Sequence, residues 1–484
     1  MRLSELFREV EFDGSIKNDA DINLVTDDSR LVRPGSLFVC IRHRSFDGHT
    51  AALDALASGA AAVVTQDRLG LENELHVADS RSTYARLCAA LCNHPERKLR
   101  MIGVTGTNGK TTVTTLIRNI LSDSGTKTLL TGTVCNRLGD ENLPSGLTTP
   151  KPPELYSLLS RAVSQRCKAC VMEASSQALA QGRLEGIDFD AAVFTNITRD
   201  HLDYHGTFEN YISAKKKLFE HSALSIVNLD DPRTNEIIAA SKGKIITFST
   251  VLDCADYTAK NISLLSDCVR FELVSKGHIE HIEFASPGLF SVSNAMAAAV
   301  CAINLGIEPK DAAQSLAKSK SVCGRLERVE CSAPYSVIID YAHTPDGLEQ
   351  VLRALRPSCR GKLIVLFGCG GDRDRTKRPL MGAAACKYAD KIIVTSDNPR
   401  SEDPTKIIGD ILKGTDKKRR DLFVEPDRRK AIALALKTAE PGDTVLLAGK
   451  GHEKYQLIGG EKLPLDERET VRKILGLPHD TGRK

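Results

Sequence analysis

A glycine-rich turn between a short apolar strand and an amphipathic helix is the feature that most constrains how this chain folds. Residues 101–105 form an apolar run, Gly106 to Gly109 supply the turn, and the apolar side chains of residues 113–121 follow helical spacing. A strand, a tight turn and a helix in this order begin a βαβ unit, in which helices cover parallel strands. The segment therefore predicts an α/β domain with a mostly parallel sheet.

Similar apolar runs recur along the chain and extend this prediction to three domains. Apart from 101–105, they lie at 36–39, 61–64, 171–172, 191–194, 225–227, 245–248, 337–339, 363–367, 392–395 and 444–447. Helical patterns, such as 82–91, alternate with these runs. A length of 484 residues suits roughly three ordinary domains. We predict α/β domains at 1–98, 99–327 and 328–484, the last of them Rossmann-like.

Composition and charge exclude several classes of protein. The chain is 41% hydrophobic and 26% charged, as in an average globular protein, and no apolar run approaches the roughly 20 residues of a membrane span. Its first twelve residues, MRLSELFREVEF, lack the apolar core of an export signal. A net charge of +4 is too small to indicate a nucleic-acid partner. We expect a cytoplasmic monomer with no membrane insertion and no nucleic-acid partner.

The fourteen cysteines are scattered and indicate reduced thiols rather than disulfides. Cys167 and Cys170 have the spacing of a zinc or redox pair, but no second Cys or His pair lies at a fitting distance in the sequence. An apparent buried strand also begins at Val171. A metal or redox role for this pair is the minor alternative.

The glycine-rich turn predicts a site for nucleotide phosphates. Backbone N–H groups of such a turn, and the N-terminus of the following helix, can hold phosphate oxygens. Lys110 would neutralise the β- and γ-phosphates, and Thr111 could bind Mg²⁺. The usual P-loop spacing has glycine where this chain has Val104, and the alternative is a turn with a solvated lysine. The predicted nucleotide-binding segment comprises Gly106, Thr107, Asn108, Gly109, Lys110, Thr111 and Thr112.

Polar residues follow two further predicted strands of the same domain. Glu173 follows one strand, and His201, preceded by Asp200, follows another. Catalytic groups gather at the carboxyl ends of parallel strands, where a carboxylate and an imidazole can reach the phosphates through a metal ion. Taken alone, each would more often be an ordinary loop residue. Beside a P-loop, they indicate a metal site.

Lys215 lies near the centre of an apolar stripe. Between Thr207 and Phe219, a rotation of ~100° per residue gathers Phe208, Tyr211, Ile212, Ala214, Leu218 and Phe219 on one helix face. Lys216 lies at the edge of that face, and Lys217 lies opposite it. A desolvated lysine has a lowered pKa and becomes a neutral nucleophile. Periodicity alone favours the alternative that Lys215 extends to water.

The motifs, taken in order, resemble those of the Mur ligase family across essentially the whole chain. They are GTNGKTT at 106–112, EASSQ at 173–177, TNITRDHLDYHG at 195–206, AKKKLF at 214–219, GRLE at 324–327, DYAHTPD at 340–346 and GCGGDRD at 368–374. The resemblance implies an α/β fold with three domains, a central P-loop-type ATPase domain and a C-terminal Rossmann-like domain. ATP and Mg²⁺ are the implied cofactors.

The resemblance also implies roles on the nucleotide side. By this resemblance, Lys110 is the lysine that contacts the phosphates, and Lys215 is the lysine that family members carbamylate. The carbamylated side chain could help to hold a second Mg²⁺. The implied Mg²⁺ site is Thr111, Glu173, His201 and the modified Lys215. Further matches are Asn294, Arg325 and Asp340 on the nucleotide side, with Tyr341 and His343 near the base. Ser291 stands where the family commonly has asparagine.

On the acceptor side, Ser29 and Arg30 resemble the uridine-pocket motif of the family. The matches for the phosphates and muramoyl peptide are Thr148, Thr149, Ser175, Gln181 and Arg183. The nearby Asp47, Gly48 and His49 also belong to the family pattern, but Arg44 replaces a glycine that is often seen before them.

Asp397, Asn398, Pro399 and Arg400 resemble the motif of the diaminopimelate-adding branch. The planar fork of Arg400 can pair with the distal carboxylate of diaminopimelate, which lysine lacks. Arg373, Gly449 and Glu453 match the remaining contacts, with Glu453 suited to the distal ammonium. The implied activity is ATP-dependent addition of meso-diaminopimelate to the D-Glu γ-carboxylate of UDP-N-acetylmuramoyl-L-Ala-D-Glu in peptidoglycan synthesis. The alternatives are a folylpolyglutamate synthase-like ligase and a P-loop NTPase switch without ligase activity.

Overall fold

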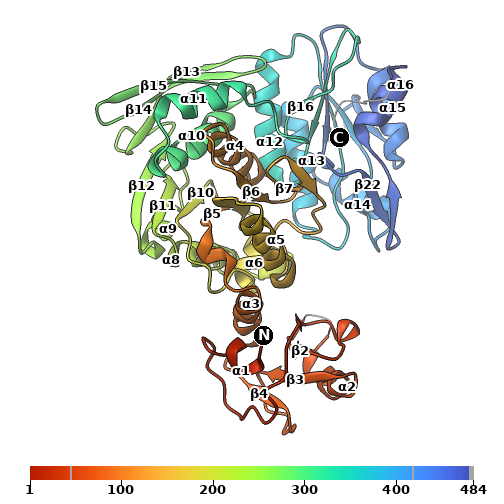
Figure 1. The fold of residues 1–484 in the computed structure, drawn as a ribbon. Helices are drawn as coiled ribbons and strands as arrows, with labels where there is room; N and C mark the ends of the chain where they lie inside the picture. Colours follow the sequence, from red (N-terminus) through yellow and green to blue (C-terminus); the bar gives the residue numbers. More distant parts are fainter. Residues whose placement is uncertain (44–45, 417–418, 479–484) are drawn as a thin grey trace.

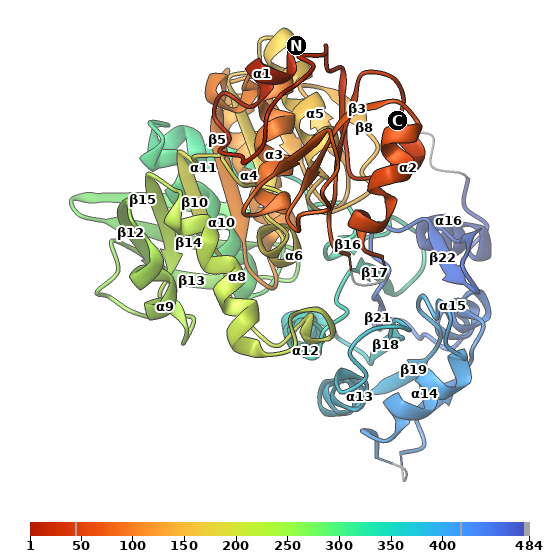
Figure 2. The ribbon, with the colours of Figure 1, turned by 90° about the horizontal axis from the view of Figure 1, so that it is seen from below.

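The computed structural model describes residues 1–43, 46–416 and 419–478, which form three α/β units. In Figure 1 the N-terminal unit lies below the central unit, and the C-terminal unit lies beside the central unit at the upper right. Seen from below in Figure 2, the C-terminal unit flanks the central one on the side of α12 (Pro345–Leu355). The predicted α/β fold with three parts is confirmed.

The N-terminal unit is a four-stranded parallel sheet in the order β1-β2-β3-β4. Its strands are β1 (Leu24–Thr26), β2 (Ser36–Val39), β3 (Ala60–Thr65) and β4 (Glu74–His76), and its helices are α1 (Leu3–Leu6), α2 (Ala52–Ala57) and α3 (Ser80–Leu91). The Asp79 carboxylate caps α3 by accepting the N–H groups of Arg81 and Ser82. Helix α3 packs on α5 (Pro152–Ser164), and one hydrophobic core runs through both units. The boundary at residue 98 stays a prediction.

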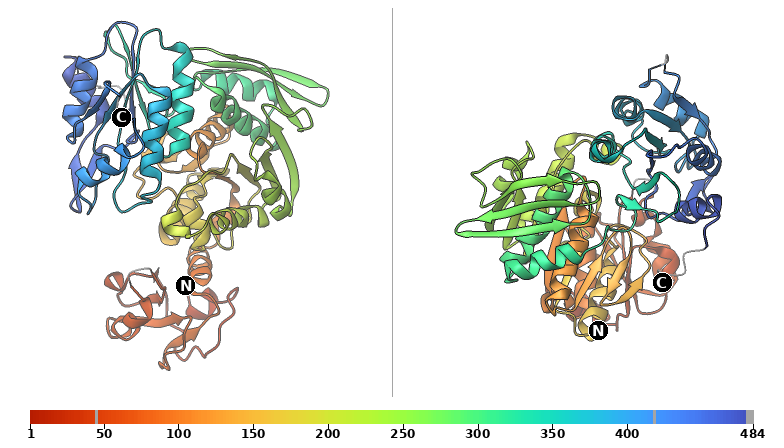
Figure 3. Two further views of the ribbon diagram at one scale, coloured as in Figure 1. Left: turned by 180° about the vertical axis from the view of Figure 1, so that it is seen from behind. Right: turned by 90° about the horizontal axis from the view of Figure 1, so that it is seen from above.

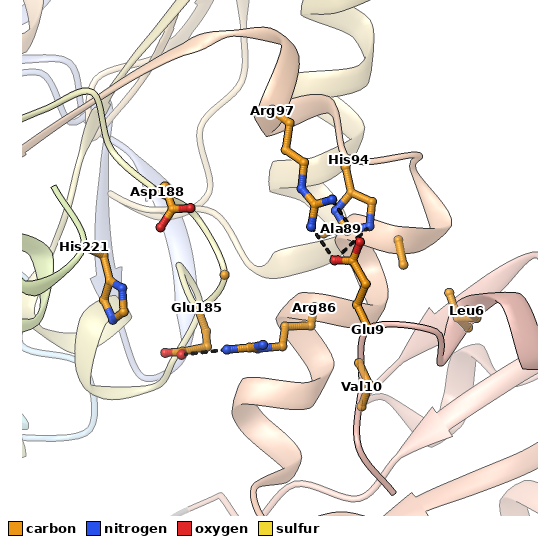
Figure 4. Close-up of a pocket in the computed structure, with 12 residues that line it drawn as sticks. Leu6, Glu9, Val10, Arg86, Ala89, His94, Arg97, Glu185, Asp188 and His221 are labelled. Carbon is orange, nitrogen blue, oxygen red and sulfur yellow. Dashed lines mark hydrogen bonds and ion pairs between the residues drawn. The ribbon is translucent and has the colours of Figure 1, made fainter. Parts of the chain in front are cut away.

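One charged pair also joins the two units, at a cavity of about 310 Å³ between them. Figure 4 shows Arg86 of α3 reaching Glu185 of the central unit, at 3.5 Å. On the other side, Arg97 donates to Glu9 at 3.0 Å, and His94 lies next to this pair. The cavity is a polar seam at the junction, because charged side chains supply much of its wall.

The central unit is an eleven-stranded sheet in the order β15-β14-β13-β12-β11-β10-β5-β9-β6-β7-β8. Neighbouring residues of one strand lie in different cores, as Met101 and Ile102 of β5 do. Because both faces are covered, its parallel strands read as continuous apolar runs. The strands are β5 (Arg100–Thr105), β6 (Thr128–Thr131), β7 (Asn136–Leu138), β8 (Glu141–Leu143), β9 (Ala169–Glu173), β10 (Ala191–Phe194), β11 (Leu224–Asn228), β12 (Lys244–Ser249), β13 (Tyr257–Leu264), β14 (Val269–Ser275) and β15 (His278–Phe284).

The predicted parallel sheet holds from β6 to β13, whereas both edges are antiparallel. Short turns connect the consecutive strands β13, β14 and β15, and likewise β6, β7 and β8. Such short connections permit only antiparallel pairing. Figure 3 shows the long hairpins of β13–β15 extending from one end of the unit. The other helices are α4 (Lys110–Asp123), α6 (Ser176–Ala180), α7 (Leu202–His205), α8 (Phe208–Glu220), α9 (Thr234–Ala240), α10 (Leu289–Asn304) and α11 (Pro309–Lys318).

The C-terminal unit is a six-stranded sheet in the order β16-β17-β21-β18-β19-β20, parallel except for β16. Strand β16 begins at Glu327, the residue at which we placed the second boundary, and that boundary stays a prediction. The strands are β16 (Glu327–Arg328), β17 (Ser336–Asp340), β18 (Leu363–Phe367), β19 (Lys391–Val394), β20 (Leu422–Val424), β21 (Thr444–Ala448), β22 (Tyr455–Ile458) and β23 (Glu461–Pro464). Besides α12, the helices are α13 (Lys377–Tyr388), α14 (Pro404–Leu412), α15 (Arg428–Lys437) and α16 (Glu467–Ile474). None of the helices in the described ranges combines the length and apolar character that a bilayer crossing needs.

Candidate active site

The glycine-rich loop connects β5 to the N-terminus of α4, as the sequence predicts. Gly109 has φ +88°, and a Cβ there would lie 2.5 Å from Oδ1 of Asn294, so both the backbone and the close approach require glycine. The ammonium of Lys110 folds back over the loop and donates to the carbonyl oxygens of Gly106 at 2.7 Å and Thr107 at 2.9 Å. Burial lowers the pKa of Lys110, against the opposing effect of nearby Glu173.

Lys215 lies inside the protein rather than at its surface. Its side chain is 1% exposed, and its ammonium donates to the Gly106 carbonyl oxygen at 2.8 Å and lies 4.6 Å from the ring centre of Tyr211. Burial lowers the pKa of Lys215 well below its ordinary value, and the charge of Lys110 lowers it further. Along the same helix, Lys216 is half-buried and Lys217 is exposed. The apolar-stripe interpretation is therefore confirmed, and extension of Lys215 to water is wrong.

Glu173 ends β9 and is 1% exposed. Thr133 holds its carboxylate by donating its backbone N–H to Oε1 at 2.8 Å and its hydroxyl to Oε2 at 3.0 Å. The same hydroxyl lies 3.0 Å from that of Thr148. Glu173 and Thr111 line one cavity, so the two predicted oxygen ligands lie on a common wall.

The predicted acceptor residues of the central unit form one hydrogen-bonded chain next to Glu173. The Thr149 hydroxyl donates to the Glu173 carbonyl oxygen at 2.6 Å and accepts the backbone N–H of Ser175 at 3.0 Å. Arg183 donates to the Thr149 carbonyl oxygen at 2.8 Å and to Oε1 of Gln181 at 2.9 Å. These four residues, scattered in the sequence, therefore form one polar surface.

His201 has a left-handed backbone, with φ +54°, at the start of α7. Its Nε2 lies 3.4 Å from Oδ2 of Asp200, which is buried. Burial lowers the pKa of His201 to about 4, and the charges of Lys110 and Lys215 also lower it. The imidazole is therefore neutral near pH 7 and lies close to both lysines, which leaves it able to act as a ligand.

A cavity of about 320 Å³ separates the glycine-rich loop from the C-terminal unit. Arg325 spans this gap, donating to the Thr111 hydroxyl at 3.1 Å while its guanidinium lies 4.7 Å from the ring centre of Tyr341. Asn108 donates to Asp346 of α12 at 3.1 Å, a second contact between the units. The predicted nucleotide-side residues on its wall are Asn108, Gly109, Thr111, Thr112, Asn294, Arg325, Asp340 and Tyr341.

Asp340, Ser291 and His343 of the nucleotide side differ in their surroundings. Asp340 accepts the backbone N–H groups of Leu326 and Ala342, both at 2.7 Å, and so helps to shape the cavity wall. Ser291 lines the cavity, but its hydroxyl donates to the Pro287 carbonyl oxygen at 2.8 Å. His343 is not among the described residues that line this cavity, and its Nε2 lies 4.0 Å from Asp200 instead.

The motif at 397–400 follows β19 and faces the loop after β21. The ammonium of Lys450, which is fully buried, donates to Oδ1 of Asn398 at 2.8 Å and to the Glu453 carboxylate at 2.6 Å. Asn398 also donates to that carboxylate at 2.9 Å. Gly449 has φ +110°, and a Cβ there would lie 2.6 Å from Oδ2 of Asp397. The structure therefore brings together Asp397, Asn398, Gly449 and Glu453.

Arg400 lies in the same region with an unusual backbone, at φ +54°. Its guanidinium donates to the Gly371 carbonyl oxygen at 2.7 Å, in the loop that carries Arg373. Burial lowers the pKa of Arg400, and Arg373 lowers it further while Asp397 and Glu453 oppose the change. Two guanidinium groups thus lie close enough to interact and are suited to an anionic group.

Ser29 and Arg30 lie apart from this site, in a short 3₁₀ helix of the N-terminal unit. Arg30 is exposed and pairs with Asp28 at 2.8 and 2.6 Å, which lowers the pKa of Asp28 to about 2. Lys151 of the central unit lies 3.4 Å from Asp27 and connects this region to the predicted acceptor surface. Arg44 lies outside the described residues.

Three family patterns match the chain. They are the "Mur ligase family, catalytic domain" at residues 21–89, the "Mur ligase middle domain" at 104–302 and the "Mur ligase, glutamate ligase domain" at 324–451. A relative from Caldanaerobacter subterraneus subsp. tengcongensis is 43% identical over 480 residues, covering 98% of this chain and 99% of its own. A relative from Syntrophomonas wolfei is 42% identical, with the same shares covered.

The chain belongs to the Mur ligase family. Both relatives carry the name UDP-N-acetylmuramoyl-L-alanyl-D-glutamate--2,6-diaminopimelate ligase. A solved structure with that name matches this Mur ligase with a TM-score of 0.71 and 35% identity, covering 98% of this chain and 99% of the other. The resemblance inferred from the motifs is confirmed.

The structure adds residues that sequence reasoning did not assign to the site of this Mur ligase. Asp200, noted only as the neighbour of His201, lies between His201 and His343. Thr133 and Lys450 hold predicted site residues through the bonds described above. The apolar strand run at 444–447, shortly before Lys450, could have pointed to this residue. Thr133 follows β6, a strand that we did not predict from the sequence.

Proposed function

We propose that this Mur ligase uses ATP to join 2,6-diaminopimelate, as the meso isomer, to the D-Glu γ-carboxylate of UDP-N-acetylmuramoyl-L-Ala-D-Glu. The observation that carries the proposal is that Arg400 and Arg373 lie beside the contact between Asn398 and Glu453. The relatives that match this chain over nearly its full length bear that ligase name. An amino acid with a carboxylate and an ammonium at its distal end matches both features. We place the reaction in the cytoplasm, in peptidoglycan synthesis.

ATP fits the cavity between the central and C-terminal units. Its phosphates would lie against the loop at 106–109 and the N-terminus of α4, where free N–H groups and the helix dipole favour anions. The ammonium of Lys110 donates to two carbonyl oxygens of this same loop, so it already lies beside the position that the phosphates would take. A short movement of the side chain would let it donate to the phosphates instead. Arg325 would reach the phosphates from the C-terminal side and Tyr341 would lie toward the base.

The residues present suit Mg²⁺. In the described ranges, no group of three or more His, Cys, Asp and Glu side chains is arranged to bind a metal by itself. Mg²⁺ is usually held by one or two carboxylates together with substrate phosphates, so Thr111 and Glu173 beside a nucleotide are an adequate protein contribution. His201 would complete this site, and Lys215, once carbamylated, would serve a second ion. The chemistry supplied by bound Mg²⁺ is neutralisation of the phosphate charges during transfer.

The reaction would proceed in two transfers. An oxygen of the D-Glu γ-carboxylate bonds to the γ-phosphorus of ATP as the bond to ADP breaks, and ADP leaves with the electron pair. The diaminopimelate amine then bonds to the acyl carbon, the carbon–oxygen bond to phosphate breaks, and the nitrogen loses a proton. Positioning by Thr149, Ser175 and Arg183 and positive charge from Lys110 would do most of the work. The bonds of Asn108 and Arg325 across the cavity would help to exclude water from the acyl-phosphate.

The test is release of phosphate from ATP across a panel of amino acids. We expect release only when the UDP-linked dipeptide and meso-diaminopimelate are both present, with L-lysine and L-glutamate as poor substitutes. Phosphate release without an acceptor would favour the NTPase switch, and use of a folate acceptor would favour the folylpolyglutamate synthase-like ligase. Either result would overturn the proposal.

A further inference from the structure

A second cavity, of about 250 Å³, opens beside the proposed metal site and shares Thr111 and Val322 with the wall of the nucleotide cavity. Thr111 and Glu173 lie at one end of it, and the remaining wall comes from α4, the β6–β7 connection and residues 320–323. Thr111, Thr115 and Arg118 follow one another on a single face of α4 at i, i+4 and i+7. The cavity thus extends about two helical turns, roughly 10 Å, from Thr111. We refer to it as the α4 groove.

The wall of the α4 groove is strongly basic. Arg118, Arg137 and Lys320 line it, and among its described lining residues Glu173 is the only acid. The Glu173 carboxylate is already held by Thr133. Asp140 lies 3.7 Å from Arg118 and 3.5 Å from Arg137, but its side chain is fully exposed, so water weakens both attractions.

The two arginines retain hydrogen-bonding capacity. Arg118 is 8% exposed, and it donates from Nη2 to the Gly139 carbonyl oxygen at 2.6 Å and from Nη1 to Asn119 at 3.3 Å. The Nε atoms of Arg118 and Arg137 are buried, and neither has a partner among the described residues. A buried N–H without a partner has lost its hydrogen bond to water, so an acceptor bound in the groove is favoured here. Burial lowers the pKa of Arg118, and Arg137 lowers it further.

We propose that the α4 groove binds the inorganic phosphate released by the ligase and provides its route away from the site. That the phosphate comes from the ligase reaction rests on the proposed function, whereas the evidence for a phosphate-binding site comes from the residues of the groove. Phosphate fits because it is a compact anion whose several oxygens can accept from two guanidinium groups at once. The groove begins at Thr111 and Glu173, beside which the phosphate would be formed, and leads to the exposed side chain of Lys320.

The direct test is calorimetric titration of inorganic phosphate into the whole protein, saturated with Mg²⁺ and β,γ-methylene-ATP. The analogue fills the glycine-rich loop, so phosphate can bind only elsewhere. We expect the double variant Arg137→Ala/Lys320→Ala to raise the Kd for phosphate at least fivefold while leaving the Kd for the analogue unchanged. Arg118→Gln should have the same effect, and its thermal unfolding shows whether it folds. Arg270→Ala, which removes an exposed arginine from the distant β14, is the matched control and should bind phosphate as the original protein does.

The outcomes separate this proposal from the proposed function. Equal phosphate affinity in the double variant and the Arg270→Ala control would overturn the groove even in an active ligase, as would the absence of phosphate binding with the analogue present. Groove-dependent binding in a protein that joins no amino acid would support the site and overturn the ligase. In an active ligase, a groove that carries phosphate should also make product inhibition by phosphate weaker in the double variant, and unchanged inhibition would count against it.

Discussion

The ammonium nitrogens of Lys110 and Lys215 lie 2.7 and 2.8 Å from the same carbonyl oxygen, that of Gly106. Two positive charges at one buried acceptor repel each other, so the charged form of one lysine is disfavoured. The charge of Glu173 opposes the drop in the pKa of Lys110, whereas the charge of Lys110 lowers the pKa of Lys215 further. Lys215 is therefore the one expected to be a neutral amine, the form that can add to carbon dioxide.

We predict that Lys215 is carbamylated in the active protein and that Lys215→Ala lowers ligation at least roughly a hundredfold, since it removes preorganised charge at the reacting phosphate. Added short carboxylates should restore part of the activity by occupying the vacated anionic position. Lys217→Ala, at an exposed position of the same helix, is the control. Intact-mass measurement checks the modification, and full activity of the alanine variant would rule it out.

Lys110→Ala should weaken ATP binding as well as turnover, because a charge held against phosphate acts in the ground state and the transition state alike. Loss of a charge-assisted hydrogen bond predicts a roughly tenfold or larger increase in the Kd for ATP. Calorimetry measures this, with Lys168→Ala at an exposed position as the control. An unchanged Kd would place Lys110 away from the phosphates.

Glu173→Ala should mainly raise the Mg²⁺ requirement, by at least roughly tenfold in the concentration that gives half-maximal phosphate release. Glu173→Gln keeps the size of the side chain and an acceptor for Thr133, so it separates loss of charge from loss of packing. Glu209→Ala, at an exposed residue of α8, should behave as the original protein does. If both Glu173 variants keep the original metal dependence, Glu173 is not a ligand.

Arg400→Ala should raise the Michaelis constant for diaminopimelate at least roughly tenfold, because truncating one side of a buried charge pair typically costs about 2–5 kcal/mol. The constants for ATP and the UDP-linked dipeptide should stay nearly unchanged. The original protein should use L-lysine poorly, and the variant should discriminate less against it. Arg375→Ala, an exposed arginine of the same unit, is the control. Efficient use of L-lysine by the original protein would contradict this role.

The pH dependence of unfolding should report on His452. Burial lowers its pKa to about 4 from an ordinary value of 6.5, and Arg325, Arg468 and Lys450 lower it too. Between pH 6.5 and 4 the unfolded chain therefore binds a proton that the folded protein does not, so the free energy of unfolding falls as the pH falls through this window. His452→Gln should flatten the decline in melting temperature between pH 7 and 5. His278→Gln, at a half-exposed position on β15, should not.

The sequence alone determined the α/β class, the central parallel strands and the family, because these depend on local patterns. Strand runs such as 191–194 and 363–367 are continuous and apolar since both faces of their sheets are covered, and the glycine-rich loop is contiguous in the chain. The edge hairpins β13–β15 were missed because one face of an edge strand contacts water and its apolar pattern is weak.

Only the tertiary structure decided how residues far apart in the chain meet. Periodicity placed Lys215 on an apolar stripe, but its burial depends on the sheet and loop that cover that helix. The contact of Arg325 with Thr111 and the bond of Lys450 to Asn398 join segments 214 and 52 residues apart. Such contacts arise when separate strands end at one edge of a sheet and two units close on each other, and no local pattern encodes that geometry.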